Sequence, residues 1–222
     1  MTEIVYKSRD VLVFNKPVGM PSQPDRSGDK DAMTYCSELL RAMGEREELY
    51  LIHRLDRVVG GLMVFARNKR TAANLSSAVA KRDFTKEYFA VADGYPEGTE
   101  MVDLIYKDPL VNRAFVTDKQ VRGAKEARLK YAVLSVKEYD GRTKALVKIS
   151  LETGRFHQIR AQFAAREMPL IGDKKYGSRD FRVNQPALFA GRLSFELNGK
   201  NYSFAVMPDI SKYPWSLFDW ET

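Results

Sequence analysis

One carboxylate lies among basic residues in the segment His53-Arg54-Leu55-Asp56-Arg57, which precedes Gly60, Gly61 and an apolar stretch. A cation close to Asp56 would lower the pKa of its carboxyl group and keep it ionised. The glycines would let backbone or a ligand approach closely. An ionised, positioned carboxylate can act as a nucleophile or as a base. Taken alone, however, such a segment more often forms a surface salt bridge in a loop.

A second segment, Thr153-Gly154-Arg155-Phe156-His157-Gln158-Ile159-Arg160, places basic side chains after a glycine at the start of an expected helix. Such a helix start suits contact with a phosphate or a carboxylate. For this stretch alone, a basic helix face exposed to solvent is an equally good interpretation.

A third segment, Lys86-Glu87-Tyr88-Phe89-Ala90-Val91, is typical of a strand in which Tyr88 and Ala90 share one face. A tyrosine near a pocket for a nucleobase can stack on the base and offer its hydroxyl for proton transfer. The alternative is an ordinary core or edge tyrosine, which is the commoner position for one of the chain's 11 tyrosines.

The first half of the chain has the elements needed to position the Asp56 segment. Apolar runs predict short strands, while apolar periodicity, a capping Asn68 and Gly44 after the last turn predict helices. The expected elements are a strand at Val11–Phe14, a turn at Asn15–Gly19, a helix at Asp31–Met43, a strand at Leu62–Ala66 and a helix from Asn68 to about Arg82.

Hairpins dominate the second half. Asp140-Gly141 separates strands expected at residues 131–139 and 144–151, and Asn198-Gly199 separates strands expected at residues 193–197 and 202–206. Between them, Phe156, Ile159 and Phe163 predict an amphipathic helix from about residue 156 to 166. Hairpins with few helices indicate an α+β fold around a largely antiparallel sheet.

Composition narrows the classes of protein. The 222 residues carry a formal charge of +7, with a pI of about 9.4, which favours a polyanionic partner such as nucleic acid, although many intracellular proteins are mildly basic. One cysteine and two histidines cannot form an internal disulfide or a typical zinc site, so metal catalysis is not expected. No apolar run is long enough to span a membrane, and the first residues do not resemble a signal peptide. A cytoplasmic location is expected.

Together, these segments resemble the RluA-type RNA pseudouridine synthase family. The matching blocks occur in the family's order and cover nearly the whole chain. They are Asn15-Lys16-Pro17-Val18-Gly19, His53 to Asp56 with Gly61 and its strand, Lys86-Glu87-Tyr88, Lys125-Glu126-Ala127-Arg128, Thr153-Gly154-Arg155 with His157-Gln158-Ile159-Arg160, and Gly172-Asp173-Lys174-Lys175-Tyr176-Gly177.

The resemblance implies an isomerase that converts uridine to pseudouridine in structured RNA, without a cofactor. It implies that Asp56 is the catalytic nucleophile or base. Tyr88 would stack on the target base and accept its proton. Arg160 would hold Asp56 in a salt bridge, with Arg155 ranked second for that role. The implied fold is a largely antiparallel mixed sheet in two sub-lobes flanked by helices, with the active-site cleft between them.

The resemblance also implies a substrate-binding set. Arg54 would enter the space left by the flipped base, and Ile159 would line the apolar pocket. The other residues expected to bind substrate are His53, Arg57, Arg155, His157 and Gln158. Seven further basic residues are expected to grip phosphates, although a solvated loop is the competing interpretation. They are Lys107, Arg113, Lys119, Arg122, Lys125, Arg128 and Lys130.

Two departures from the family pattern concern loop geometry and the choice of RNA more than the chemistry. Val58-Val59-Gly60 replaces a usual polar trio, and Gln162 stands where a histidine is common. We expect one catalytic domain over residues 1–222 without a separate N-terminal RNA-binding module, acting as a monomer on ribosomal RNA slightly more readily than on tRNA. The alternatives are a catalytically silent RNA-binding or ribosome-assembly protein on the same fold and, more distantly, a hydrolase using Asp56 with His53 or His157.

Overall fold

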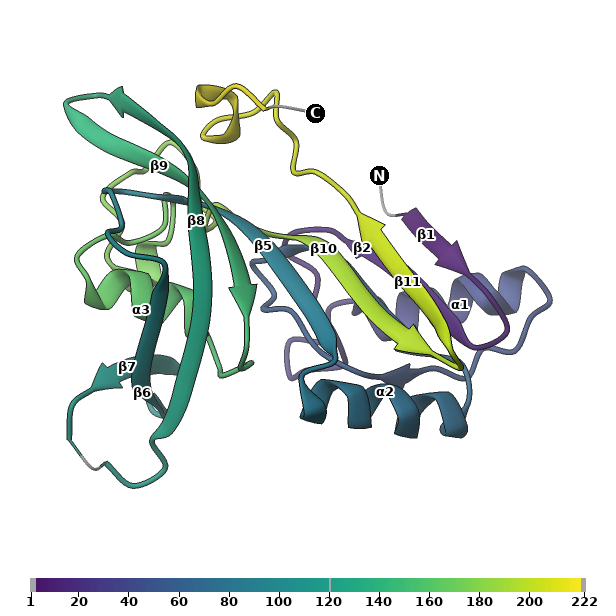
Figure 1. Ribbon diagram of the computed structural model, residues 1–222. Helices are drawn as coiled ribbons and strands as arrows, with labels where there is room; N and C mark the ends of the chain where they lie inside the picture. The colour runs from purple at the N-terminus through teal and green to yellow at the C-terminus, as the bar shows by residue number, and fades with distance from the viewer. Residues whose placement is uncertain (1–2, 120, 221–222) are drawn as a thin grey trace. The chain divides into compact units, whose positions relative to one another are not determined.

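The computed structural model of the chain describes residues 3–119 and 121–220. The chain forms two compact units (Figure 1). Unit 1 comprises Met1–Lys86 and Ala190–Met207, and unit 2 comprises Glu87–Phe189 and Pro208–Thr222. The chain passes from one unit to the other within β5 (Phe84–Ala92), within β10 (Leu188–Leu197) and again between Met207 and Pro208.

Unit 1 is a sheet with two helices. Besides parts of β5 and β10, its elements are β1 (Glu3–Lys7), β2 (Val11–Lys16), α1 (Ala32–Ala42), β3 (Tyr50–Leu51), β4 (Gly60–Ala66), α2 (Lys69–Lys81) and β11 (Lys200–Ala205). The strand order is β1-β2-β4-β10, with β11 beside β10 and β3 beside one end of β4. The pairs β1–β2, β2–β4, β3–β4 and β10–β11 are antiparallel.

The core of unit 1 explains why these segments are strands and helices. Every residue of β4 is buried, as expected for a strand of apolar residues with sheet on both sides. Its core joins β2, β4, α2, the start of β5 and β10 through Val11, Val13, Leu62, Val64, Ala66, Leu75, Phe84, Leu193, Phe195 and Leu197. The predicted strands at residues 11–14 and 62–66 are thus confirmed, and each is extended by two residues.

Side-chain caps fix where both helices of unit 1 begin. Asp31 accepts a hydrogen bond from the Thr34 amide (3.0 Å) before α1, and Asn68 accepts one from the Thr71 amide (2.8 Å) before α2. Arg82 ends α2 in the left-handed conformation. Both helices therefore confirm the expectation from the sequence to within one or two residues.

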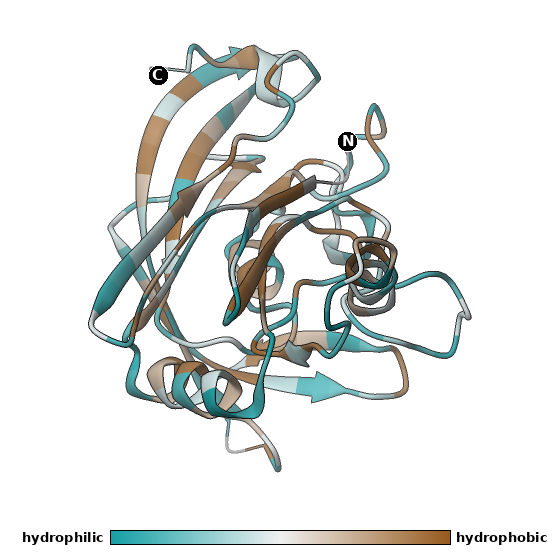
Figure 2. Cartoon of the chain, turned by 90° about the vertical axis from the view of Figure 1, so that its right-hand side faces the viewer, coloured by the Kyte–Doolittle hydropathy of each residue, from teal (hydrophilic) through white to brown (hydrophobic). Residues whose placement is uncertain are grey.

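Unit 2 is built mainly from long antiparallel strands. Besides its parts of β5 and β10, it contains β6 (Glu100–Asp108), β7 (Arg113–Thr117), β8 (Lys125–Tyr139), β9 (Arg142–Leu151), α3 (Gln158–Ala165) and two short 3₁₀ helices, η1 (Lys174–Tyr176) and η2 (Trp215–Leu217). The strand order is β5-β9-β8-β6-β7, and these four pairs are antiparallel. Bands of hydrophobic and hydrophilic residues alternate along the long curved strands in Figure 2.

Both predicted hairpins are present, and both turns have two residues with positive φ. Asp140 and Gly141 have φ of 57° and 69°, and Asn198 and Gly199 have φ of 54° and 73°. This is the backbone that Asx-Gly pairs adopt most readily between antiparallel strands. β8 is longer than expected because it continues beyond its hairpin to pair with β6, and β10 begins earlier than expected, at Leu188.

The prediction for α3 was wrong at its start. The helix begins at Gln158 rather than at about residue 156, because His157 has a left-handed backbone (φ 51°) and stands outside it. Phe156 consequently leaves the helical stripe and stacks on the His157 imidazole, with ring centroids 3.8 Å apart.

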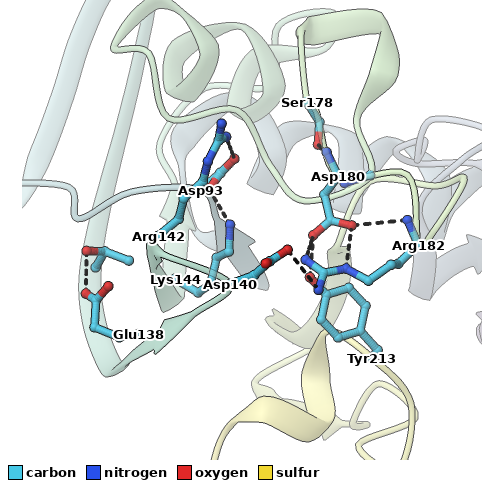
Figure 3. A network of polar contacts seen from close by, with 11 residues as sticks. Asp93, Glu138, Asp140, Arg142, Lys144, Ser178, Asp180, Arg182 and Tyr213 are labelled. Carbon is cyan, nitrogen blue, oxygen red and sulfur yellow. Dashed lines mark hydrogen bonds and ion pairs between the residues drawn. The ribbon is translucent and has the colours of Figure 1, made fainter.

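A polar network holds the C-terminal segment to the rest of unit 2 (Figure 3). Asp180 accepts two hydrogen bonds from the Arg182 guanidinium (2.6 and 3.0 Å) and one from the Tyr213 hydroxyl. The Arg182 guanidinium also lies 4.5 Å from the centroid of the Tyr213 ring. A second group in the same view joins Asp93, Arg142 and the buried Lys144. These contacts lie near the Asp140-Gly141 turn of the β8–β9 hairpin.

Among the described residues, no helix has the length and apolar character needed to cross a bilayer.

Candidate active site

The Asp56 loop in unit 1 lies between β3 and β4, and a buried serine holds its backbone. The Ser22 hydroxyl donates to the Leu55 carbonyl (2.7 Å) and accepts from the Leu55 amide (3.0 Å). The Leu55 side chain is buried, whereas Asp56 next to it is half-buried. The Asp56 carbonyl accepts from the Val59 amide at 3.0 Å, which closes a turn. The chain is therefore fixed on both sides of the carboxylate.

Lys16 also holds the Asp56 loop by hydrogen bonds to backbone carbonyls. Its side chain is 1% exposed, and its ammonium donates to the carbonyls of Pro17 (3.0 Å), Met20 (2.7 Å) and Arg57 (3.4 Å). Burial lowers the pKa of Lys16 to about 7, an effect that the nearby Asp56 carboxylate opposes and the Arg57 guanidinium reinforces. Lys16 therefore joins the Asn15–Gly19 turn to the Asp56 loop and contributes positive charge near the carboxylate.

The other basic residues of the loop differ in their positions. Arg57 is directed to the preceding loop, where it pairs with Asp29 and donates to the Ser27 hydroxyl (3.0 Å). Arg54 is exposed. Among the predicted substrate-binding residues of unit 1, Arg54 is thus the one whose position best suits contact with a ligand.

His53 is half-buried, and its imidazole contacts residues of the core. Its Nε2 accepts from the Val64 amide (3.2 Å), and its ring packs against Phe84 at a centroid distance of 5.5 Å. Burial, reinforced by the Lys86 charge, lowers the pKa of His53 to about 3. The imidazole is neutral at physiological pH, so these contacts favour a structural role over binding of a phosphate.

Gly61 permits a close approach between two strands behind the loop. It has a φ of +117°, and a Cβ atom there would lie 2.3 Å from the Ala190 carbonyl oxygen and 2.7 Å from the Ala190 amide nitrogen. The expectation that a glycine here allows backbone to approach closely is confirmed.

In unit 2, Gln158 organises the Thr153–Arg160 segment. Its buried side-chain oxygen accepts from the Thr153 hydroxyl (2.8 Å) and the Arg155 amide (3.0 Å), while its nitrogen donates to the Arg128 carbonyl (3.1 Å). The exposed Arg155 donates through Nε to the Glu126 carbonyl (2.8 Å). These bonds show how Gln158 positions the turn that leads into α3.

Arg160 is buried in unit 2 and rigidly oriented. Its Nε and Nη2 donate to the two carboxylate oxygens of Asp173 at 2.7 and 2.8 Å. The Tyr176 ring lies on the guanidinium, with its centroid 4.9 Å away, and the Tyr176 hydroxyl contacts Nδ1 of His157 at 2.9 Å. A fork-shaped pair of this kind fixes the plane of the guanidinium.

Tyr88 is also buried in unit 2. It lies on β5 opposite Ile149 of β9 and is 6% exposed. Ile159, on α3, is 4% exposed. The catalytic set predicted from the sequence therefore draws on both units, with Asp56 in unit 1 and Tyr88 and Arg160 in unit 2.

The structure explains why Gln162 stands where the family commonly has a histidine. Its side-chain nitrogen donates to an Asp103 carboxylate oxygen at 2.6 Å, and the Arg166 guanidinium binds the same carboxylate at 3.0 Å. Gln162 is fully buried, so it joins α3 to β6.

The seven basic residues expected to grip phosphates are not equivalent. Arg128 and Lys130 both pair with Glu152, at 3.6 and 3.2 Å. Lys107 lies 4.3 Å from the centroid of the Phe156 ring, and Arg113 lies 4.7 Å from that of Tyr176. Lys119, Arg122 and Lys125 are exposed. The last three therefore have the positions best suited to bind a polyanion.

Three residues that matter to this geometry received no role from the sequence, namely Lys16, Ser22 and Asp173. Lys16 and Asp173 lie inside the family-like blocks, so those blocks were a signal that could have identified them. Ser22 has no comparable signal. Among the described residues, no group of three or more His, Cys, Asp or Glu could hold a metal ion.

The fold and the ordered blocks define a class of RNA-modifying enzymes, and comparison with known proteins shows which one. Residues 10–165 match the family model described as RNA pseudouridylate synthase. The chain belongs to this family, whose members are isomerases.

Individual relatives agree with this assignment. The chain is 30% identical to the dual-specificity RNA pseudouridine synthase RluA of Vibrio parahaemolyticus, over 96% of this chain and 85% of that protein. It is 30% identical to ribosomal large subunit pseudouridine synthase D of Zymomonas mobilis, over 93% of this chain and 69% of that protein. The solved structure of human RNA Pseudouridylate Synthase Domain Containing 1 has the same fold, with a TM-score of 0.77 at 24% identity, covering 97% of this chain and 86% of that one.

Several relatives are longer than the matched region. The chain spans 59% of an RNA pseudouridine synthase of Aquifex aeolicus and 53% of the synthase D of Yersinia pestis.

Proposed function

We propose that this protein isomerises uridine to pseudouridine in structured RNA, with Asp56 as the nucleophile. One observation carries the proposal: Asp56 is half-buried in a loop that Ser22 and the buried Lys16 hold by hydrogen bonds to its backbone. A surface salt bridge would need no such support. Membership of the pseudouridine synthase family supplies the reaction.

The reaction balances without a second reactant. The bond between C1′ of the ribose and N1 of the uracil breaks, the base turns, and a bond forms between C1′ and C5. The proton on C5 leaves and N1 gains one, so the product is an isomer of the substrate. Neither an electron carrier nor an energy source is required, which agrees with the expectation of an enzyme without a cofactor.

Arg160 and Tyr88 complete the proposed catalytic set. Arg160 would pair with Asp56 and keep it ionised, and its fixed plane on Asp173 supports a role in positioning. Tyr88 would stack on the target base and accept the C5 proton, and Ile159 would line the pocket. Their burial supports this assignment, because a pocket that excludes water strengthens the electrostatic interactions inside it.

The target base must leave the helical stack before it can react, which costs a few kcal/mol. Arg54 would fill the space left behind, and its exposure beside the anchored Leu55 supports that role. Arg155, Arg57 and His157 would contact RNA around the flipped nucleotide. Gln158 and His53 would hold the two segments in place.

We propose ribosomal RNA as the slightly favoured substrate over tRNA, with the protein acting as a monomer in the cytoplasm. Relatives named for the ribosomal large subunit support the first choice, and the dual-specificity relative keeps tRNA open. A pseudouridine map of all RNA from a strain lacking this protein tests the proposal. The expected result is the loss of one or a few sites in ribosomal RNA that return when the protein is restored. If the strain lacking the protein has the same pseudouridine map as its parent, grown under conditions in which the parent contains the protein, the catalytically silent alternative would be favoured.

A further inference from the structure

Unit 1 has a polar groove that the proposed chemistry does not use. Its volume is about 950 Å³, and it lies where β1 turns into β2 and where α2 begins. Besides the turn at residues 7–10 and the start of α2, its walls include Glu45 and Arg46, which follow α1, and Asn198 from the β10–β11 turn. All of these residues belong to unit 1.

The groove has an excess of positive charge. Two carboxylates line it, those of Asp10 and Glu45, against five cationic side chains. The cations are those of Lys7, Arg9, Arg46, Arg67 and Arg70. The formal excess is three positive charges in one groove. The first turn of α2 adds the positive end of a helix of 13 residues.

Internal contacts occupy the carboxylates and leave cations on the surface. Glu45 pairs with both Lys7 and the buried Arg67, which also donates to the Ser8 carbonyl (2.7 Å). Arg9 and Arg70 are exposed, and within the described ranges neither forms an ion pair. These two guanidinium groups can therefore bind an external anion.

The other carboxylate of the groove is also engaged. Asp10 accepts hydrogen bonds from the side-chain nitrogen of Asn68 (2.9 Å) and the hydroxyl of Thr71 (3.4 Å). Asn68 in turn caps α2 through the Thr71 amide. The Asp10 charge is thus tied to the start of α2, and the groove keeps its positive excess.

Among the described residues, those that line the groove include no apolar one, and this favours a nucleic acid over a protein partner. Protein–protein contacts usually have an apolar or aromatic centre. Contacts to a nucleic-acid backbone use arginine, lysine, serine, threonine and asparagine side chains together with helix N-termini. The lining of this groove has that composition.

The groove lies at the opposite end of the sheet from the Asp56 loop. Val11 of β2 pairs with Ala66 of β4 beside the groove, whereas Lys16 pairs with Gly61 beside the loop. The six-residue step from Gly60 to Ala66 corresponds to roughly 20 Å along a strand. A ligand in the groove is therefore too far from Asp56 to be the target nucleotide.

We propose that this groove binds the phosphate backbone of the same RNA at a point about 20 Å from the target uridine. The choice of RNA rests on the proposed function, whereas the anion-binding character rests on the groove alone. Such a contact would favour substrates with a stem extending well beyond the modified loop, and it would carry no sequence preference of its own.

The test measures binding of two labelled RNA hairpins that share one loop and differ in stem length. One stem has about 5 base pairs and the other about 20, enough to pass the roughly 16 base pairs that span successive grooves of an RNA helix. The variant Arg9→Gln/Arg70→Gln removes two exposed charges from the groove. The matched control, Lys137→Gln/Lys212→Gln, removes two exposed charges from unit 2. Within the described part of the chain, these lysines pair with the exposed Asp219 and Asp209.

For the long hairpin, the groove variant should bind roughly tenfold more weakly at low salt, and its plot of log affinity against log salt should be shallower by about two. The short hairpin should bind to both variants alike. Equal behaviour of the groove variant and the control on the long hairpin would overturn the proposal, as would an equal loss on both hairpins. The binding test measures no turnover, so the two proposals can fail separately. If the protein formed no pseudouridine in any RNA, the proposed function would be refuted and the result of the binding test would still stand.

Discussion

Lys16 links the core of unit 1 to the catalytic loop. A fully buried ammonium is stable there only because carbonyl oxygens surround it and Asp56 lies nearby. Replacing it with methionine would keep the volume and remove both the charge and the three hydrogen bonds. We infer that Lys16 is a positioning residue, since its ammonium donates to backbone carbonyls of the turn and the loop.

This inference predicts a pH-dependent stability. The pKa of Lys16 is about 7 in the folded protein and near 10.5 in the unfolded chain, so between these values the unfolded chain binds more protons. Stability should therefore rise with pH across this window, by up to about 1.4 kcal/mol per pH unit. Urea unfolding from pH 7 to 10 should show this slope in the wild type, and Lys16→Met should lack its share of it. The exposed Lys81→Met is the control and should retain the wild-type slope; an unchanged slope in Lys16→Met would contradict the account.

The environment of a single residue could be predicted where residue type and local spacing determine it. It could not be predicted where a contact with a distant part of the chain determines it. The core strand around Val64 follows from composition, but the position of His53 against that strand required the fold. Asp173 was visible only as part of a block, because its partner Arg160 lies 13 residues earlier in the chain. Ser22 and Leu55 are 33 residues apart, and no pattern in either segment predicts that they form hydrogen bonds with each other.

At the scale of elements, the contact between β4 and β10 depends on Gly61. A methyl group there would overlap the Ala190 backbone, and φ is positive as well. Gly61→Ala should therefore lower the free energy of unfolding by about 3 kcal/mol or more.

Gly141→Ala is the matched control, because Gly141 also has a positive φ but no atom lies within 4 Å of a Cβ built there. It should lower the stability by only about 1 kcal/mol. Chemical denaturation of both variants decides between these values, and equal losses would show that the close approach to β10 has no energetic weight.

The pair between α3 and the segment before η1 gives a prediction for catalysis. Asp173→Asn would remove the charge that orients Arg160, and breaking a buried pair costs about 3–5 kcal/mol. We expect lower stability and, at a temperature where the variant is folded, a kcat at least about tenfold lower than that of the wild type. Asp180→Asn breaks another arginine pair of unit 2 and should reduce stability without changing kcat. If both variants keep wild-type kcat, Asp173 has no role in positioning.

The elements themselves were largely predictable, because their signals are local. Asx-Gly turns fix both hairpins, and Asp31 and Asn68 cap their helices as their positions suggest. The start of α3 was missed because the left-handed His157 is set by its contacts with Phe156 and Tyr176. Apolar periodicity cannot report such a contact.

At the scale of the whole molecule, we expect the net charge of +7 to contribute to RNA binding mainly through one region, residues 118–125. Reversing two exposed charges in the 118–125 region, with Lys119→Glu/Lys125→Glu, should weaken RNA binding and make its salt dependence shallower by about two. Lys137→Glu/Lys212→Glu changes the net charge equally and should have a smaller effect. Salt titrations of a labelled RNA hairpin compare the two, and identical curves would discard a specific role for this region.

The most direct measurement concerns the chemistry of Asp56. RNA from a strain lacking the protein is incubated with the wild type or with Asp56→Asn, and pseudouridine is mapped chemically at every position. We expect complete conversion at one or a few uridines by the wild type and none by Asp56→Asn, which should still fold and bind RNA. Equal conversion by the two proteins would contradict the assignment of Asp56 as the nucleophile.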